Sequence, residues 1–350
     1  MKICFVLNNI KTETCGTSVI ILRKAHQRGH QVYVMGVDDF IYHKNNGIYL
    51  SCKEIPENIE DNSLKNFWKN VQDEKLKSKV IFSGDLDILF LRNNPTEEPL
   101  HRYWAGHCGM AFARMIQKTG VLVLNDAVGL SKAYIDKLYF EEFPAEIKPE
   151  SLITRKKEEI LDFWKRNKQE IILKPLEGSG GKDVYKIGKD KKNLNQILEN
   201  ILRKGYIIAQ EYLPEAKNGD IRVIVMNGKI LKQDNQLAII RRISKDKAEF
   251  RSNLTLGGIP KKAELTPEIE HIVSLVGPKL IRDGLFFVGL DIVKDKLIEI
   301  NVLSPGGIDH YQKTGMTDFT DAVVKALERK IVYKAKNRSK IENNVLATME

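Results

Sequence analysis

The sequence lacks the features that mark a secreted, zinc-binding or membrane-spanning chain. Only four of its 350 residues are cysteine, and they lie far apart without a Cys-x-x-Cys pair, so we expect neither a disulfide framework nor a zinc site. No apolar run reaches the roughly 18 residues of a membrane span, and the apolar stretch in MKICFVLNNIK is too short for a signal peptide. We therefore expect a cytoplasmic protein with no membrane partner.

Two common nucleotide-binding loops are also missing. In a Walker A loop a serine or threonine follows the lysine, but Lys182 is followed by Asp183. The pattern Gly-x-Gly-x-x-Gly fails as well, because Asp183 stands where the third glycine belongs. The sequence thus excludes both motifs.

Basic residues are in excess without forming a nucleic-acid-binding motif. The net charge of +10 comes from 56 basic and 46 acidic residues that are mostly interspersed, which favours anionic ligands. The densest basic stretch is the tail at residues 329–350, which we expect to be a helix end followed by a solvated extension. No helix-turn-helix, zinc finger or RNP-like motif accompanies it, so a nucleic acid partner is not expected, and RNA contact is only a minor alternative.

What the sequence does contain is a candidate hairpin, FVGLDIVKDKLIEINVLSPGG, at residues 287–307. If residues 294–296 form a three-residue turn, Val293 pairs with Leu297, and two further pairs follow in register: Asp291 with Glu299, and Gly289 with Asn301. Side chains alternate across a strand, so one face carries Asp291, Glu299 and Asn301. The other face carries an apolar row fit for a core, made of Ile292, Ile298, Ile300 and Val302.

The polar face of this hairpin is a candidate metal site. Carboxylate and carboxamide oxygens suit Mg²⁺, which usually arrives with the phosphates of a nucleotide. The alternative is that this face is the solvated side of an antiparallel hairpin. A phosphate-binding loop elsewhere in the chain would favour the metal.

Such a loop is predicted in EIILKPLEGSGGKDVYKI at residues 170–187. A short buried strand is followed by Lys174 and then by a segment whose backbone N–H groups can form an anion nest: Gly178, Ser179, Gly180 and Gly181. An ordinary flexible hairpin loop is the alternative. Lys174, a fixed cation just upstream, favours phosphate binding.

The order of periodic segments predicts the domain organisation. A strand at residues 2–8, a helix at 17–30 and a strand at 31–37 give a β-α-β order that DLDILFLRN, the segment 103–119 and GVLVLND continue. We expect a parallel, Rossmann-like domain over residues 1–122, with residues 44–79 irregular apart from one possible helix. Beyond it, residues 123–205 carry the glycine loop and residues 206–328 the hairpin, and Asn227-Gly228 predicts a type I′ turn.

Seven motifs in order resemble bacterial glutathione synthetase, a family of ATP-grasp ligases, over about residues 80 to 328. They are NDAVGLSKAYIDKLYF, ITR, IILKPLEGSGGKDVYKI, AQEYLPEAKNGDIRVIVMNGK, FRSNLTLGG, GLFFVGLDIV and LIEINVLSP. The resemblance implies an α/β and α+β fold, in which a Rossmann-like N-terminal domain precedes an ATP-grasp fold of two α+β subdomains that hold ATP between them. It also implies a ligase that joins γ-glutamylcysteine to glycine with ATP and Mg²⁺, or Mn²⁺, and that assembles into a homo-oligomer, either a dimer or a tetramer.

The resemblance also implies roles for individual residues. Lys137 and Lys174 would contact the nucleotide phosphates under the loop from Gly178 to Gly181. The adenine would be bound by the hinge residues Gln210, Glu211, Tyr212 and Leu213. Asp220 and Arg222 match the Asp-x-Arg of the family, with Arg222 directed to the transferred phosphate or acyl phosphate, and the Mg²⁺ ligands would be Asp291, Glu299 and Asn301.

The chemistry implied by this family requires protection from water. A carboxylate is activated by taking the γ-phosphoryl of ATP, and an amine then attacks the acyl phosphate. Because acyl phosphates hydrolyse, the polar segment from Arg241 to Gly258 is predicted to act as a lid, with Arg251 as its catalytic contact. The substrate-binding residues would be Arg242 and Asn253, together with Ser304, Gly306 and Gly307 for the acceptor.

The N-terminal domain departs from the family pattern. Asn8-Asn9-Ile10 stands where the family has Asp-Pro after the first strand, and Arg92-Asn93-Asn94-Pro95-Thr96 replaces Arg-Lys-Asp-Pro-Pro. The carboxylate donor is therefore less firmly predicted than ATP. Two alternatives stay open: another ATP-grasp amino-acid or peptide ligase, and a nucleotide-binding regulatory protein that has lost turnover.

Overall fold

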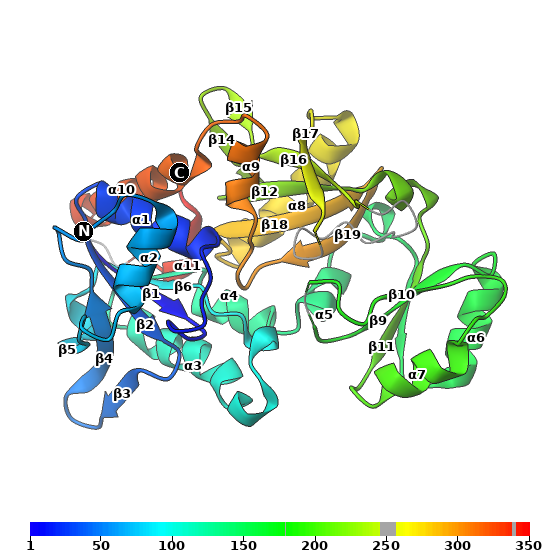
Figure 1. Ribbon diagram of the computed structural model, residues 1–350, viewed down its shortest axis with the longest axis horizontal. Helices are drawn as coiled ribbons and strands as arrows, with labels where there is room; N and C mark the ends of the chain where they lie inside the picture. Colours follow the sequence, from blue (N-terminus) through cyan, green and yellow to red (C-terminus); the bar gives the residue numbers. More distant parts are fainter. Residues whose placement is uncertain (179, 246–256, 338–340) are drawn as a thin grey trace.

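The computed structural model describes residues 1–178, 180–245, 257–337 and 341–350, and arranges them around three large sheets. Figure 1 shows the N-terminal sheet at one end of an elongated molecule and the β8 to β11 sheet at the other end. The sheet that contains β12, β18 and β19 lies between them. None of the helices in the described residues is both long and apolar enough to cross a membrane.

The first sheet has a parallel centre, as predicted. Its strands run in the order β2 (Gln31–Gly36), β1 (Lys2–Leu7), β6 (Ile88–Leu91) and β7 (Leu122–Leu124). The helix α1 (Thr17–Gln27) connects β1 with β2, and α3 (Ala105–Gln117) connects β6 with β7. Because β7 pairs with β6, this sheet extends two residues beyond residue 122.

The possible helix predicted within residues 44–79 is present, but the expectation that the rest of this segment is irregular was wrong. It contains β4 (Gly47–Glu54) and α2 (Leu64–Gln72), and β4 pairs with β3 (Phe40–His43) and β5 (Lys79–Phe82). The strand signal was present, because the buried residues of β4 alternate with half-buried ones: Ile48, Leu50 and Cys52. The start of α2 is capped by Ser63 Oγ, which accepts a hydrogen bond from the Asn66 N–H at 3.1 Å.

The second sheet is antiparallel and has a core of its own. Its order is β10 (Tyr185–Ile187), β9 (Ile171–Pro175), β11 (Ile207–Glu211) and β8 (Ser151–Thr154). The helices α6 (Lys157–Arg166) and α7 (Leu194–Leu202) cover it, and their buried side chains form one cluster with the strands. The main members of this cluster are Ile160, Phe163, Trp164, Leu173, Leu198, Ile201 and Ile207.

The third sheet is also antiparallel. Its order is β17 (Ile259–Lys262), β16 (Ile239–Ile243), β12 (Asp220–Met226), β18 (Phe287–Val293) and β19 (Lys296–Asn301). The short β13 (Lys229–Ile230) pairs with β12 through the predicted turn, in which Asn227 has φ 53° and Gly228 has φ 74°. These two positive φ values confirm the type I′ turn.

The first and third sheets share their buried interior. Side chains of β1, β6 and β18 belong to the same hydrophobic cluster as those of α8 (Pro267–Arg282). Asn125 fixes the junction, because its Nδ2 donates to Phe287 O at 3.1 Å and to Val302 O at 2.8 Å, while its Oδ1 accepts from the Phe287 N–H at 2.9 Å. The remaining described helices are α4 (Ala127–Lys132), α5 (Asp136–Glu141), α9 (Ile308–Lys313), α10 (Phe319–Lys336) and α11 (Asn343–Thr348), and β14 (Lys232–Gln233) pairs with β15 (Gln236–Leu237).

The tail begins, as predicted, with the end of a helix, since α10 runs to Lys336, but the expectation of a solvated extension after it was wrong for the described residues 341–350. Lys330 is only 1% exposed, and its Nζ donates to Asn227 Oδ1 at 2.9 Å and to the Met349 carbonyl. Asn343 bonds to both backbone groups of Val123, so α11 adds a buried layer beside β7. The apolar residues that anchor α11, Leu346 and Ala347, are too few to stand out in a basic tail.

The buried Lys330 makes the stability of the protein depend on pH. Burial lowers its pKa to about 7, and the nearby Arg329 lowers it further while Glu350 opposes this. A lysine in an unfolded chain titrates near 10.4, so from pH about 7 to about 10 the unfolded state binds more protons and stability rises with pH. We expect the free energy of unfolding, measured by chemical denaturation, to rise by up to about 1.4 kcal/mol per pH unit more for the native chain than for Lys330→Met.

The exposed Lys336→Met on the same helix is the matched control and should keep the native pH dependence. A Lys330→Met protein whose stability followed pH as the native chain does would contradict the assignment.

Candidate active site

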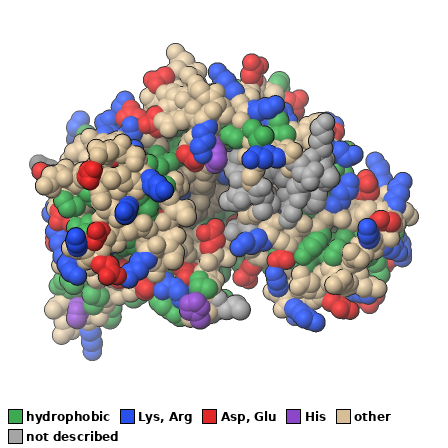
Figure 2. Space-filling view, viewed as in Figure 1, with side chains coloured by type: hydrophobic (Ala, Val, Ile, Leu, Met, Phe, Trp, Pro, Cys, Tyr) green, Lys and Arg blue, Asp and Glu red, His purple; other side chains and the backbone are tan. Residues whose placement is uncertain are grey.

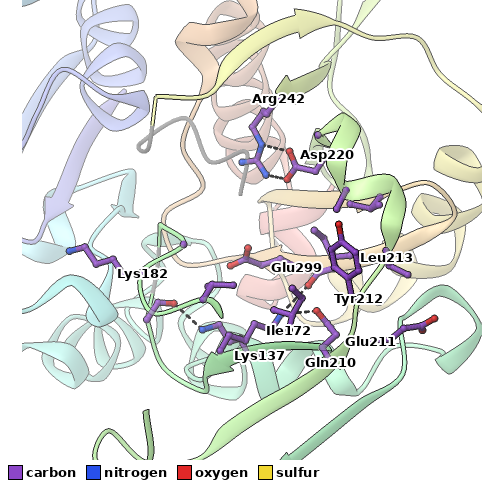
Figure 3. A pocket seen from close by; sticks show the side chains of 18 residues that line it. Lys137, Ile172, Lys182, Gln210, Glu211, Tyr212, Leu213, Asp220, Arg242 and Glu299 are labelled. Carbon is purple, nitrogen blue, oxygen red and sulfur yellow. Dashed lines mark hydrogen bonds and ion pairs between the residues drawn. The ribbon is translucent and has the colours of Figure 1, made fainter. Parts of the chain in front are cut away.

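A cavity lies where the second and third sheets meet. Its lining comes from β9, the glycine loop and β11 on one side, and from β12, β16, β18 and β19 on the other. Figure 3 shows Glu299 between the Arg242–Asp220 pair and Lys137. The surface is hollowed near the centre of the molecule, between its two ends (Figure 2).

The cavity collects most of the residues that the sequence singled out. Those that line it are Lys137, Lys174, Gly178, Gly181, Gln210, Glu211, Tyr212, Leu213, Asp220, Arg242 and Glu299. Gly180 belongs to the same glycine loop but does not line the cavity. Ser179, Arg251 and Asn253 lie outside the described residues, as does most of the predicted lid, of which only the two ends at residues 241–245 and 257–258 are described.

Two of the lysines that line the cavity make hydrogen bonds that fix their positions. Lys137 Nζ donates to Pro175 O at 2.8 Å and to Gly178 O at 3.1 Å, which ties α5 to the start of the glycine loop. Lys174 Nζ donates to Gln210 Oε1 at 3.2 Å. Burial lowers the pKa of Lys174 to about 8, with Glu299 opposing the shift and Lys137 adding to it.

Asp136 is a charged neighbour of these lysines that the sequence analysis did not single out. Burial raises the pKa of its carboxyl to about 7, and repulsion from Glu299 adds to the rise, whereas Lys137 and Lys174 oppose it. Burial also lowers the pKa of Lys137. Burial therefore opposes the positive charge of both lysines.

Apolar side chains complete the cavity, and the sequence analysis missed them. They are Ile172, Val184, Val293 and Ile298. Ile172 was within reach of prediction, because it stands two residues before Lys174 on β9 and so shares its face. Tyr212 and Leu213 extend this apolar wall, and Lys186 Nζ lies 3.5 Å from the centre of the Tyr212 ring. Such a wall suits a flat, apolar ring system such as adenine.

The β18–β19 hairpin has the predicted pairs but a different turn. Asp291 pairs with Glu299 and Gly289 pairs with Asn301, as expected. The three-residue turn was wrong, because Val293 pairs with Lys296 and Ile292 pairs with Leu297. The register shifts after Asp291, which leaves Ile298 as an extra residue in a β-bulge.

The bulge reassigns Ile298 from the core to the cavity. Leu297 takes the buried place that was predicted for Ile298, and the core row consists of Ile292, Leu297, Ile300 and Val302. The Ile298 carbonyl turns toward Lys174 Nζ at 3.5 Å, and its side chain lines the cavity. A bulge that re-aims a side chain beside a ligand site is a common use of this feature.

A row of alternating charges crosses the third sheet beside the cavity. Arg222 on β12 faces Asp291 on β18, and Nη2 of Arg222 donates to Asp291 Oδ2 at 2.9 Å. Arg242 on β16 faces Asp220 on β12, donates from Nε to Asp220 Oδ1 at 2.8 Å, and lies 3.0 Å from Asp291 Oδ2. All four side chains are buried.

The ion pairs in this row shift the pKa values of two of its members. Burial alone would raise the pKa of Asp291, but Arg222 and Arg242 outweigh it and hold that pKa below its usual value. Burial would likewise lower the pKa of Arg242, and the carboxylates of Asp291 and Asp220 raise it instead. Asp291 and Arg242 therefore keep their charges at neutral pH.

The donor set of the hairpin fits a hard cation such as Mg²⁺. Glu299 lines the cavity and pairs with Asp291 across the hairpin, and Asn301 Nδ2 donates to Asp291 Oδ2 at 3.4 Å, so the hairpin brings two carboxylates and one carboxamide to neighbouring positions. Asp291 is already ion-paired, which leaves Glu299 as the carboxylate that faces the cavity. Within the described residues, no group of three or more His, Cys, Asp or Glu side chains is arranged to hold a metal.

The predicted acceptor segment lies beside the charge row and not in the cavity lining. Arg222 Nη1 donates to Gly306 O at 3.1 Å, and Arg92 Nη2 donates to Pro305 O at 2.8 Å. Gly307 has φ 96° and precedes α9, while Ser304 is half-buried in the same segment. Arg92 belongs to the N-terminal domain, so this domain holds the segment in place.

The depressed pKa of Lys174 predicts how nucleotide binding depends on pH. Phosphates bind the ammonium form, which is lost in the free protein above pH about 8. We expect the Kd for a non-hydrolysable ATP analogue to rise above that pH by up to about tenfold per unit. Lys174→Met should bind weakly and lose this dependence, whereas Lys182→Met, an exposed lysine of the same cavity, should keep it. Titration calorimetry at several pH values measures both, and equal pH profiles for Lys174→Met and the native chain would contradict the role of Lys174.

Solved structures show the same fold at low sequence identity. One is the D-alanine–D-alanine ligase from Bacillus anthracis complexed with ATP, with a TM-score of 0.51 and 14% identity over 95% of this chain and 99% of that chain. Another is the ATP-grasp ligase PsnB complexed with a precursor variant, Mg and ADP, with a TM-score of 0.60 and 13% identity over 95% of this chain and 98% of that chain. These likenesses confirm the ATP-grasp fold.

Curated relatives are closer in sequence. Glutathione synthetase of Buchnera aphidicola subsp. Schizaphis graminum is 33% identical over 93% of this chain and 94% of its own length. Glutathione synthetase of Vibrio cholerae is 31% identical over 92% of this chain and 94% of its own length. The family models of the prokaryotic glutathione synthetase N-terminal domain and ATP-grasp domain match residues 1–130 and 136–315. The chain therefore belongs to the prokaryotic glutathione synthetase family.

Proposed function

We propose that the protein is an ATP-dependent ligase that forms glutathione from γ-glutamylcysteine and glycine through an acyl phosphate. The observation that carries this proposal is the convergence of Lys137, Lys174 and Glu299 with an apolar wall in one cavity, in a chain of this family. Such a cavity offers cations for phosphates, a carboxylate for a metal, and an apolar surface for a base.

The nucleotide lies between the second and third sheets in this proposal. Gln210 to Leu213 contact the adenine, Lys137 and Lys174 offset the charge of the phosphates, and the loop from Gly178 to Gly181 closes over them. Asp220 anchors Arg242 beside the phosphates. Glu299, Asn301 and Asp291 would hold Mg²⁺ or Mn²⁺, which would supply positive charge to offset that of the transferred phosphoryl group.

Two arginines stabilise the activated donor. Arg222 and Arg242 are fixed in orientation by Asp291 and Asp220, so their guanidinium groups need no reorganisation as charge develops on the acyl phosphate. Arg251 and Asn253 add contacts from the predicted lid. Ser304, Gly306 and Gly307 receive the acceptor amino acid next to Arg222.

The donor is bound beside the N-terminal domain, where the sequence departs from the family. Asn8 Oδ1 accepts from the Asn94 N–H at 2.6 Å, and Asn8 Nδ2 donates to Asn94 O at 2.8 Å and to Glu98 Oε1 at 2.7 Å. The two departures therefore contact each other and form one surface. A donor other than γ-glutamylcysteine would be accommodated there, and ADP release across a panel of carboxylate donors, with glycine as acceptor, tests which one is used.

The proposal also covers the localisation, the oligomeric state and the partners of the enzyme. We infer a cytoplasmic homo-oligomer, either a dimer or a tetramer, that acts on small molecules alone. Size-exclusion chromatography with light scattering measures the oligomeric state.

The metal assignment predicts the effect of one substitution. Glu299→Gln keeps the size of the side chain and removes a charge that faces the cavity, so the protein should fold while kcat falls by at least about a hundredfold, or roughly 2.7 kcal/mol of transition-state stabilisation. Asp295→Asn, an exposed carboxylate in the turn of the same hairpin, is the control and should leave ADP release unchanged. If kcat of Glu299→Gln in saturating Mg²⁺ stayed within about threefold of the native value, the metal assignment would be wrong.

A further inference from the structure

The second half of the proposed reaction needs a group that takes a proton. The amino group of glycine is an ammonium ion at neutral pH, and it has no free electron pair until a proton leaves. The side chains described around the cavity are mostly unsuited to this task. Lys137, Lys174 and the two arginines act as cations, while Asp220 and Asp291 are ion-paired with Arg242 and Arg222.

His310 on α9 has the required properties, and the sequence analysis did not single it out. Its Nδ1 is buried and has no hydrogen-bond partner among the residues that the structure describes. Its Nε2 lies 3.6 Å from Asp309 Oδ2, on the opposite side of the ring. The Asp309 carboxylate therefore lies on the Nε2 side of the ring, which favours the tautomer with the proton on Nε2 and leaves the Nδ1 electron pair available.

The position of α9 brings His310 to the charge row. The next residue, Tyr311, is fully buried and donates from its hydroxyl to Arg222 O at 3.2 Å. The segment just before the helix accepts a hydrogen bond from Arg222 Nη1 at Gly306 O. Arg222 and Arg242 are near enough to the imidazole to act on its charge. The His310 N–H donates to Gly307 O at 3.1 Å, so His310 stands at the proposed acceptor segment.

The surroundings keep the imidazole neutral. Burial lowers the pKa of His310, Arg242 and Arg222 act in the same direction together with Lys313, and Asp309 opposes them. Lys313 is itself paired with Asp309 at 2.7 Å. Of the other elements packed on α9, β17 carries the exposed Lys261 and Lys262, and Lys24 of α1 pairs with Asp318 at the start of α10 at 2.7 Å.

We propose that Nδ1 of His310 accepts the proton from the ammonium group of the acceptor amino acid. The proposal rests on the proposed function. The proton moves from the amine nitrogen to Nδ1, and the freed electron pair forms the C–N bond with the carbonyl carbon of the acyl phosphate. The C–O bond to phosphate then breaks, phosphate leaves with that electron pair and takes a second proton from the nitrogen, and the imidazolium returns its proton to solvent.

Asp136 is another group near the cavity that can lose its charge close to neutral pH. Its position argues against a role as the proton acceptor. It lines a small cavity with Lys137, Lys174 and Glu299, on the side of the lysines. That side serves the nucleotide phosphates in the proposed mechanism. His310 is on the side of Gly306 and Arg222, where the acceptor is placed.

The test compares two acceptors in the His310→Gln protein. Glycine must lose a proton before it attacks, whereas hydroxylamine is uncharged at neutral pH and attacks an acyl phosphate directly. With γ-glutamylcysteine, ATP and Mg²⁺, we expect kcat for glycine to fall by about a hundredfold or more, and kcat for hydroxamate formation to stay within about threefold of native. The native kcat for glycine should also rise with pH through the lowered pKa of His310, and the variant should lack that acidic limb.

His271→Gln, which removes an exposed histidine on α8, is the matched control and should match the native chain with both acceptors. Hydroxamate formation by His310→Gln also reports that the variant is folded and makes the acyl phosphate. Equal losses with both acceptors, or no loss with glycine, would overturn the role of His310. If the native chain made no product from γ-glutamylcysteine, the proposed function would fail, and the same two acceptors with the donor that does support ADP release would then decide the role of His310.

Discussion

The active site depends on the buried row of charges Asp220, Arg242, Asp291 and Arg222. The row spans three neighbouring strands, and every member is held by a partner on the next strand. Removing one member would leave an unpaired charge inside the protein, at a cost of about 3–5 kcal/mol. Because Asp220 and Arg242 line the cavity and Arg222 donates to the Gly306 carbonyl, the register of the third sheet and the geometry of the site are set together.

The sequence predicted the parts of the site that depend on local patterns. The alternation in β18 and β19 placed Asp291 opposite Glu299, and the glycine cluster after Lys174 indicated a loop at the site, of which Gly178 and Gly181 line the cavity. It could not predict the bulge at Ile298, because a one-residue shift of register depends on which apolar side chain fits the core better, and Leu297 and Ile298 are equally apolar. The partners of Arg222 and Arg242 were also out of reach, since they depend on β12 lying between β16 and β18.

The errors in the predicted fold lie in segments that are polar overall and contain only a few apolar residues. The strand β4 and the helix α11 each bury few side chains, and both lie in stretches whose overall composition is polar. Tertiary contacts outweigh composition in such places, as the bonds from Asn343 to Val123 and from Lys330 to Asn227 illustrate. The sequence analysis did not identify His310 for a related reason. A role can be assigned to a histidine in a short helix only when its neighbours in space are known.

The separate core of the second sheet affects how the enzyme responds to substitutions in that sheet. The first and third sheets share their buried clusters, but the second sheet, with α6 and α7, buries its side chains in a cluster that contains no residue from either of the others. This unit can therefore open or loosen while the rest stays folded. Since it supplies one wall of the cavity in which we propose that ATP binds, bound ATP would stabilise it by mass action, and the effect of a weakening substitution in its core would depend on the cellular concentration of ATP. Such a variant would be folded and active at a high concentration of ATP and would lose activity at a low one.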